Sequence, residues 1–120
     1  MNTDNLIQTI IELPRQFYKS GDKSIRTLLK ESGYFETFDK ITENNIANKL
    51  QASIEIINDW ILWSENKRSS SGWAFFESNN KHYIVEYISN GTKSDTHEYS
   101  DKRIAYAAFI KREIESIRLS

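Results

Sequence analysis

The sequence predicts an α+β domain in the order ααα-βββ-α, and three observations carry this prediction. Helix-spaced apolar residues dominate the segment 1–66, aromatic and β-branched runs with a period of two begin at residue 72, and an Ala/Ile-rich helical stripe follows them. A length of 120 residues suits one domain, 1–120, with a helical part (1–66) and a β-meander plus helix (72–120). We expect N-terminal helices, a three-stranded antiparallel β-meander and a C-terminal helix.

The first half begins with an expected helix of two parts. Its apolar positions recur at helical spacing and include Leu6, Ile10, Leu13 and Phe17. Pro14 lies inside this pattern and removes one backbone hydrogen bond, so we expect a kink or a restart there. A shorter second helix follows, with Asp22 as its N-cap and Gly33 at its end. The segment 34–41 is ambiguous.

The strongest periodic signal predicts one long core helix from Thr42 to about Asn66. Its apolar face consists of Ile46, Leu50, Ile54, Ile57 and Ile61. Trp60 and Trp63 extend this face, so we interpret them as core residues rather than as a ligand cage. The polar run 67–72, with three serines and a glycine, ends the helical half.

Three strands and a last helix are expected in the second half. The runs 73–77 and 82–88 are rich in aromatic and β-branched residues, and the segment 78–81 between them reads as a hairpin. Asn90-Gly91 is typical of a type I′ turn into a more polar strand, 92–99. Ser100 or Asp101 then caps a helix whose stripe includes Tyr106, Ala107, Ile110, Ile114 and Ile117.

Strand alternation assigns the side chains to two faces of the predicted sheet. With turn centres at 79–80 and 90–91, one face carries Ala74, Phe76, Tyr83, Val85, Tyr87, Ser94, Thr96 and Glu98, and the other carries Trp73, Phe75, Glu77, His82, Ile84, Glu86, Ile88, Asp95, His97 and Tyr99. A shift of one residue in the register exchanges these faces. Helices can cover one face and leave the other partly open as a partner site, or the N-terminal helices can cover both.

The second face also groups carboxylates with imidazoles. Glu86 is expected opposite Asp95, near Glu77, His82 and His97, and such residues can bind a metal or exchange protons. The alternative is a polar surface or a charged interface patch, and no H-E-x-x-H motif supports a metal site. In the interface interpretation, changing Glu86 and Asp95 to Lys weakens binding and leaves the fold intact.

Composition and missing motifs exclude several function classes. The chain has no cysteine, so it has no disulfide, no thiolate zinc site and no cysteine nucleophile. It also lacks a G-x-S-x-G elbow, a Walker loop and a dinucleotide fingerprint. A net charge of −1 gives no general attraction to nucleic acid, and Lys67, Arg68 and Trp73 are too few for a nucleic-acid site. No apolar run reaches the roughly 18 residues of a membrane span. We expect a cytoplasmic protein that is not an enzyme and needs no cofactor or metal.

Several segments of the second half resemble bacterial toxin-immunity proteins. They are W-S-E-N-K-R-S-S-S-G-W-A-F-F-E (63–77), H-Y-I-V-E-Y-I (82–88), E-Y-S-D (98–101) and A-Y-A-A-F-I-K-R-E-I (105–114). Proteins of this family are encoded beside contact-dependent or other polymorphic toxins. The resemblance implies a cytoplasmic protein that binds one cognate toxin C-terminal domain and blocks its active site or an essential surface. The resemblance does not assign a functional role to any individual residue of this sequence.

These observations lead to one functional hypothesis and two competitors. The hypothesis is toxin neutralisation without nucleic acid or membrane as partner, and the expected partner-binding residues are Trp73, Tyr83, Glu86, Tyr87, Asp95 and His97. One competitor is a structural or regulatory protein that forms a homodimer through Phe109 and Ala105 on the last helix. The other is a small metal-dependent enzyme built on His82, Glu86, Asp95 and His97.

Overall fold

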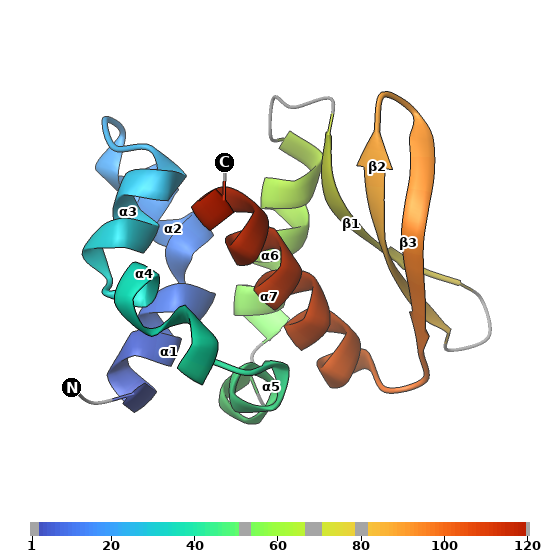
Figure 1. Cartoon of the computed structure of the whole chain (residues 1–120), viewed down its shortest axis with the longest axis horizontal. Coiled ribbons are helices and arrows are strands. Elements are labelled where there is room, and N and C mark those ends of the chain that lie inside the picture. Colours follow the sequence, from blue (N-terminus) through green and yellow to red (C-terminus); the bar gives the residue numbers. More distant parts are fainter. Residues whose placement is uncertain (1–2, 51–53, 67–70, 79–81, 120) are drawn as a thin grey trace.

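The computed structural model describes residues 3–50, 54–66, 71–78 and 82–119. Its elements are α1 (Thr3–Ile11), α2 (Leu13–Ser20), α3 (Ile25–Glu31), α4 (Tyr34–Thr37), the 3₁₀ turn η1 (Phe38–Lys40), α5 (Glu43–Leu50), α6 (Ile54–Asn66), β1 (Ser71–Glu77), β2 (Tyr83–Ser89), β3 (Thr92–Tyr99) and α7 (Lys102–Leu119). Helices precede a three-stranded antiparallel sheet and a C-terminal helix, which confirms the predicted α+β class. Figure 1 shows α7 between the N-terminal helices and the sheet.

The expected restart at Pro14 is present. Helix α1 ends at Ile11, and α2 begins at Leu13 with Pro14 in its first turn, where a missing N–H costs least. The carbonyl of Ile11 accepts a hydrogen bond of 2.8 Å from the indole Nε1 of Trp60, which is fully buried. Trp60 is therefore a core residue, as predicted, and it holds α6 against the break between α1 and α2.

The prediction of one long helix from Thr42 to Asn66 is wrong. The segment forms α5 and α6, whose axes point in different directions (Figure 1). Helix α5 packs on α1 and α7, whereas α6 packs on α2 and β1. Both helices bury apolar residues with the same period, so the periodicity alone could not separate them. The ambiguous segment 34–41 contains α4 and η1, and the N-cap of α3 is Ser24 rather than Asp22.

The strands follow one another in the order β1-β2-β3, as a meander. Asn90 (φ 51°) and Gly91 (φ 84°) both take the left-handed conformation of the predicted type I′ turn. Asp101 caps α7, because its Oδ1 accepts a hydrogen bond of 3.1 Å from the backbone N–H of Ile104. The local turn and cap signals in the sequence therefore mark the ends of these elements correctly.

The predicted register between the first two strands is wrong by one residue. Glu77 pairs with Tyr83 instead of His82, so Trp73 pairs with Tyr87 and shares a face with it. The expected turn centre, Asn79-Asn80, lies outside the described residues. A register shift between Val85 and Tyr87 also changes the pairing with β3. Glu86 consequently does not pair with Asp95, which takes a positive φ of 49°.

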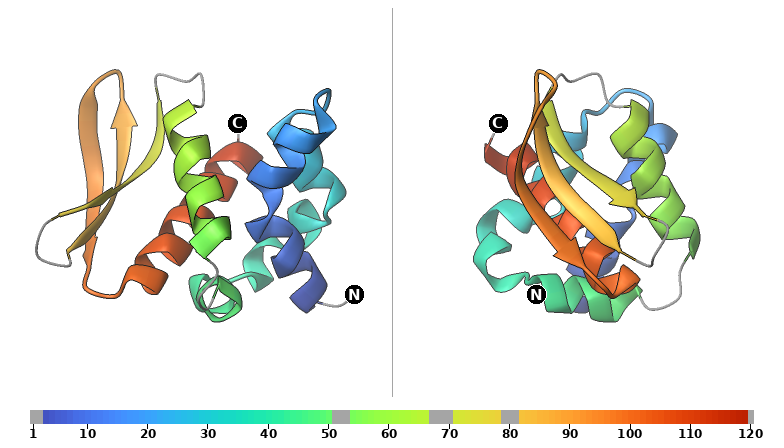
Figure 2. Two further views of the ribbon diagram at one scale, coloured as in Figure 1. Left: turned by 180° about the vertical axis from the view of Figure 1, so that it is seen from behind. Right: turned by 90° about the vertical axis from the view of Figure 1, so that its right-hand side faces the viewer.

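The two faces of the sheet have different surroundings. Phe75 on the inner face stacks on Tyr106 of α7, with ring centres 4.2 Å apart. On the outer face, Phe76 is 42% exposed. All described helices lie behind the inner face, as the right-hand view of Figure 2 shows. The sheet therefore has one covered and one open face, as the sequence alternation allowed.

The last helix contributes heavily to the core. Ala105 and Phe109 are completely buried, and Phe109 belongs to the same core cluster as Trp60 and Val85. The expectation of a dimer interface at Phe109 and Ala105 is therefore wrong, because both side chains are buried inside the protein and cannot contact a second copy. Among the described residues, no helix has both the length and the apolar character needed to cross a membrane.

Candidate functional site

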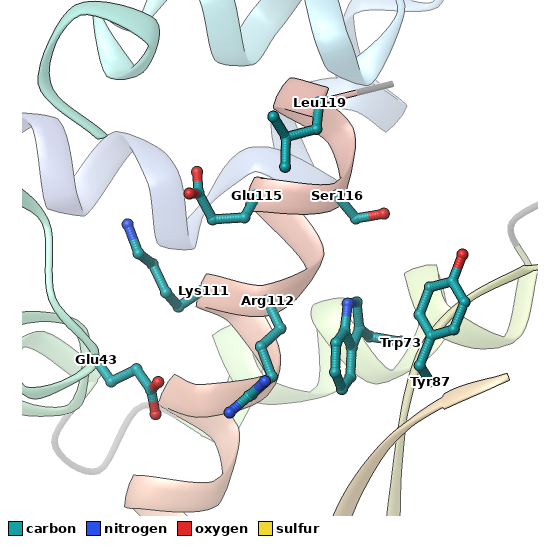
Figure 3. A pocket seen from close by; sticks show the side chains of 8 residues that line it. All are labelled: Glu43, Trp73, Tyr87, Lys111, Arg112, Glu115, Ser116 and Leu119. Atoms are coloured by element: carbon teal, nitrogen blue, oxygen red, sulfur yellow. The ribbon is translucent and has the colours of Figure 1, made fainter. Parts of the chain in front are cut away.

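A groove lies over the C-terminal half of α7. It has a volume of about 690 Å³, and a second hollow of about 530 Å³ continues it toward η1. Figure 3 shows the strand residues on one side, Glu43 of α5 on the other and α7 between them. The larger hollow is lined by Glu43, Trp73, Tyr87, Lys111, Arg112, Glu115, Ser116 and Leu119.

The helical spacing of α7 divides the polar residues of the groove into two stripes. Residues three and four apart lie on the same side of a helix. Lys111, Glu115 and Arg118 therefore form one stripe, directed toward α4 and η1. Arg112 begins the next stripe, one residue further round the helix, and contacts the sheet. Each stripe forms a different kind of contact with the element facing it.

The first stripe and Tyr34 form what we call the framework wall (Tyr34, Lys111, Glu115 and Arg118). The hydroxyl of Tyr34 donates to Glu115 Oε2 at 2.6 Å, and Lys111 Nζ donates to the same hydroxyl and to the Phe38 carbonyl, each at 2.7 Å. Arg118 donates to both carboxylate oxygens of Glu115, at 2.8 and 3.2 Å. Its guanidinium also lies 3.7 Å from the ring centre of Phe38. These bonds join α4, η1 and α7.

The electrostatics of the framework wall follow from this geometry. Burial raises the pKa of Tyr34 well above its ordinary value, and the hydrogen bond to Glu115 adds to the shift. Burial alone would raise the pKa of Glu115, but the hydrogen bonds from Arg118 and Tyr34 and the charge of Lys111 outweigh it, so that pKa is lowered. Burial lowers the pKa of Lys111, and Glu115 opposes that effect. The carboxylate is thus held in its charged form by its neighbours.

The other side of the groove is what we call the aromatic wall (Trp73, Tyr87, Arg112 and Asp95). Trp73 and Tyr87 meet edge to face with ring centres 5.5 Å apart, and the Arg112 guanidinium lies 4.9 Å from the Trp73 ring centre. Arg112 Nη1 is 3.8 Å from Asp95 Oδ2, a long ion pair, while His97 Nε2 is 2.9 Å from Asp95 Oδ1. The arginine is therefore held between an indole and a carboxylate.

The contacts of Arg112 are less complete than those of the framework wall. Its Nε is buried and has no hydrogen-bond acceptor among the described residues. Burial raises the pKa of the neighbouring Tyr99, the charge of Glu43 adds to this, and Arg112 opposes it. The side chain of Arg112 is 25% exposed. Arg112 thus presents a charged, planar group to the groove without a saturated set of hydrogen bonds.

The structure brings together four of the six residues predicted to bind a partner. Trp73 and Tyr87 line the groove, Asp95 lies beside Arg112, and His97 contacts Asp95. Tyr83 is buried and stacks on Phe75, with ring centres 6.2 Å apart. The sequence prediction placed these residues on both sheet faces. The four that the structure brings together lie at one end of the inner face.

Glu86 lies on the outer face, apart from this group. It is 5% exposed, accepts a hydrogen bond of 3.0 Å from Thr96 and lies 3.5 Å from Lys93 Nζ. Because Glu86 is buried, Glu86→Lys would place an ammonium group in a buried position next to the positive charge of Lys93, so we now expect this variant to destabilise the fold. The predicted cluster of Glu86 with Asp95 and His97 is also wrong, because the register shift separates them.

No set of three or more His, Asp and Glu side chains that could hold a metal ion occurs among the described residues. Ser116 is the hydroxyl on the floor of the groove, and no histidine is among the described residues that line the groove with it. Lys67 and Arg68, considered with Trp73 for nucleic-acid binding, lie outside the described residues. The groove therefore offers aromatic and charged contacts to a ligand.

Sequence reasoning missed Arg112, which is central to the aromatic wall. The signal is the polar triplet Lys111-Arg112-Glu113 within an Ala/Ile-rich helix. Only the correct strand register shows that its second member faces Trp73. Comparison of the chain with protein-family models, with curated proteins and with solved structures found no match.

Proposed function

We propose that this chain is an immunity protein, which binds the C-terminal domain of a cognate toxin in the cytoplasm and neutralises it. The observation that carries the proposal is the aromatic wall, where Trp73, Tyr87 and Arg112 meet at the rim of a groove. Tryptophan, tyrosine and arginine are the residues that most often dominate the energy of protein interfaces. The resemblance of 63–77, 82–88, 98–101 and 105–114 to toxin-immunity proteins supports the choice of partner.

The shape of the site favours a protein partner. The groove is wide and continues into a second hollow, so an inserted loop or helix of the toxin would contact both walls. Trp73 and Tyr87 are half-buried already, so little side-chain freedom is lost when a partner covers them. Asp95 and Glu43 supply local negative charge for a basic toxin surface, although the chain as a whole carries only −1.

The test begins with purification of the protein from its native host, a high-salt wash and mass spectrometry of what remains bound. We expect one partner that corresponds to the C-terminal domain of a large secreted protein. Expression of that domain alone should stop growth, and co-expression of this chain should restore it. A stable partner that is harmless to cells would contradict the proposal.

Two matched variants then locate the contact. Arg112→Gln removes the guanidinium from the aromatic wall, and Arg103→Gln removes an exposed one from the first turn of the same helix. We expect Arg112→Gln to lose protection against the toxin and Arg103→Gln to retain it. Equal protection by both variants would place the toxin contact outside the groove.

A further inference from the structure

The two edges of the sheet differ in how well they are protected against pairing with another strand. Edge strands are commonly protected by charges, prolines or bulges. Strand β3 has such protection, because it contains Lys93, Asp95 and Glu98 and its pairing with β2 is irregular opposite Glu86. Strand β1 pairs with β2 without a shift over its whole length, and Glu77 is its only charged residue.

The hydrogen-bond pattern shows which backbone groups of β1 face away from β2. Ser78 N–H donates to the His82 carbonyl at 2.9 Å, which makes these two residues a hydrogen-bonded pair. Because such pairs alternate along an antiparallel ladder, the N–H and C=O groups of Phe75 and Glu77 point outward. No backbone hydrogen bond joins these outward groups to another element within the described part of the chain.

We propose that β1 pairs with β1 of a second copy of this chain, antiparallel and around a two-fold axis at Phe75. The two sheets of three strands would then form one continuous sheet. The two Phe75 residues would exchange a pair of backbone hydrogen bonds. This inference does not rest on the proposed toxin binding, although Trp73 of the groove lies within the strand that would pair.

Side-chain size and charge favour this register. It places the small Ala74 of each copy directly opposite Phe76 of the other on the outer face, and cross-strand neighbours lie about 5 Å apart. Phe76, now 42% exposed, would be covered in the same step. Glu77 would face Trp73 of the second copy, so the only charged residues of the two strands would not oppose each other.

The test measures molar mass by light scattering over a range of protein concentrations. Glu77→Pro removes an outward N–H and places a proline ring at the β1 edge, without removing a bond to β2. The matched control is Glu98→Pro on β3. Tyr83 and Val85 of the middle strand bond to β3, so Glu98 also faces outward and is likewise exposed.

We expect the natural chain and Glu98→Pro to rise from 14.1 kDa toward twice that mass as concentration increases. Glu77→Pro removes this N–H from both copies, so the dissociation constant should rise at least about tenfold, or about 1.4 kcal/mol, as expected for two lost hydrogen bonds of about 0.7 kcal/mol each. Phe76→Lys, which places a charge opposite Ala74 and leaves the backbone unchanged, should have the same effect and serves if the proline variant fails to fold. A natural chain that stays monomeric up to about 1 mM would overturn the proposal. Loss of the dimer in Glu98→Pro alone would also overturn it.

Discussion

The two walls of the groove are built from neighbouring stripes of one helix, yet their polar side chains differ in how completely they are hydrogen-bonded within the protein. In the framework wall, both oxygens of Glu115 accept hydrogen bonds from Arg118, and Tyr34 adds a third. In the aromatic wall, the nearest carboxylate to Arg112 is 3.8 Å away and its Nε has no acceptor among the described residues. The polar groups of the framework wall are therefore bonded to one another, whereas those of the aromatic wall are bonded less completely.

This difference suggests separate roles, with the framework wall stabilising the fold and the aromatic wall binding a partner. A buried hydroxyl and a carboxylate that bond to each other contribute to folding, and a partner could use them only by breaking those bonds. The Arg112 side chain, which lies over an indole and is 25% exposed, breaks no short ion pair when a partner approaches. We therefore expect substitutions in the framework wall to reduce the free energy of unfolding, and substitutions in the aromatic wall to reduce affinity.

Glu115→Ala should have the largest effect on stability. It leaves the buried Tyr34 hydroxyl without its acceptor, and we expect a loss of about 2–3 kcal/mol in the free energy of unfolding. Urea denaturation measures this. The control is Glu55→Ala, at a carboxylate whose side chain is 87% exposed, which should change stability by less than about 0.5 kcal/mol. Equal losses in the two variants would mean that the framework wall does not stabilise the fold.

Tyr34→Phe should have an intermediate effect. It keeps the buried ring but removes the hydroxyl that links Lys111 to Glu115, so we expect a loss of about 1–1.5 kcal/mol by urea denaturation. Tyr18→Phe is the matched control, because Tyr18 is 49% exposed and should lose almost nothing. If Tyr34→Phe were as stable as the natural chain, Lys111 and Glu115 would have to be satisfied without the hydroxyl.

The pH dependence should reveal the same carboxylate by a smaller effect. Because the folded-state pKa of Glu115 lies below its ordinary value of 4.5, its contribution to stability is present above that pH. The contribution is lost as the pH falls through the folded pKa, since the unfolded chain binds the proton first. Urea midpoints between pH 7 and pH 3 should therefore fall less steeply in Glu115→Gln than in the natural chain. Parallel curves would show that Glu115 titrates alike in both states.

Local sequence signals were sufficient for the class of the fold and for the ends of several elements. The glycine of Asn90-Gly91 tolerates positive φ, and the side chain of Asp101 reaches a free N–H, so these turns and caps depend on a few neighbouring residues. The division of the segment 42–66 into α5 and α6 was not predictable in the same way. It depends on which distant elements each half contacts.

The candidate site was predictable in its residue types but not in its assembly. Trp73 and Tyr87 stood out as aromatic strand residues, but the register of β1 against β2 decides whether they share a face. The irregular pairing opposite Glu86 has no local signal beyond the tolerance of Asp95 for positive φ. Arg112 joins the site only through the packing of α7 on the sheet.

The affinity of the Arg112→Gln variant for its toxin domain tests the division between the two walls most directly. Calorimetric titration should show binding weakened by about 30-fold, or about 2 kcal/mol, with Arg103→Gln unchanged. The free energy of unfolding of Arg112→Gln should fall by no more than about 1 kcal/mol, since a cation–π contact and a long, partly exposed ion pair with Asp95 are lost. An unchanged affinity, or a loss of stability as large as that of Glu115→Ala, would contradict the assignment of recognition to the aromatic wall.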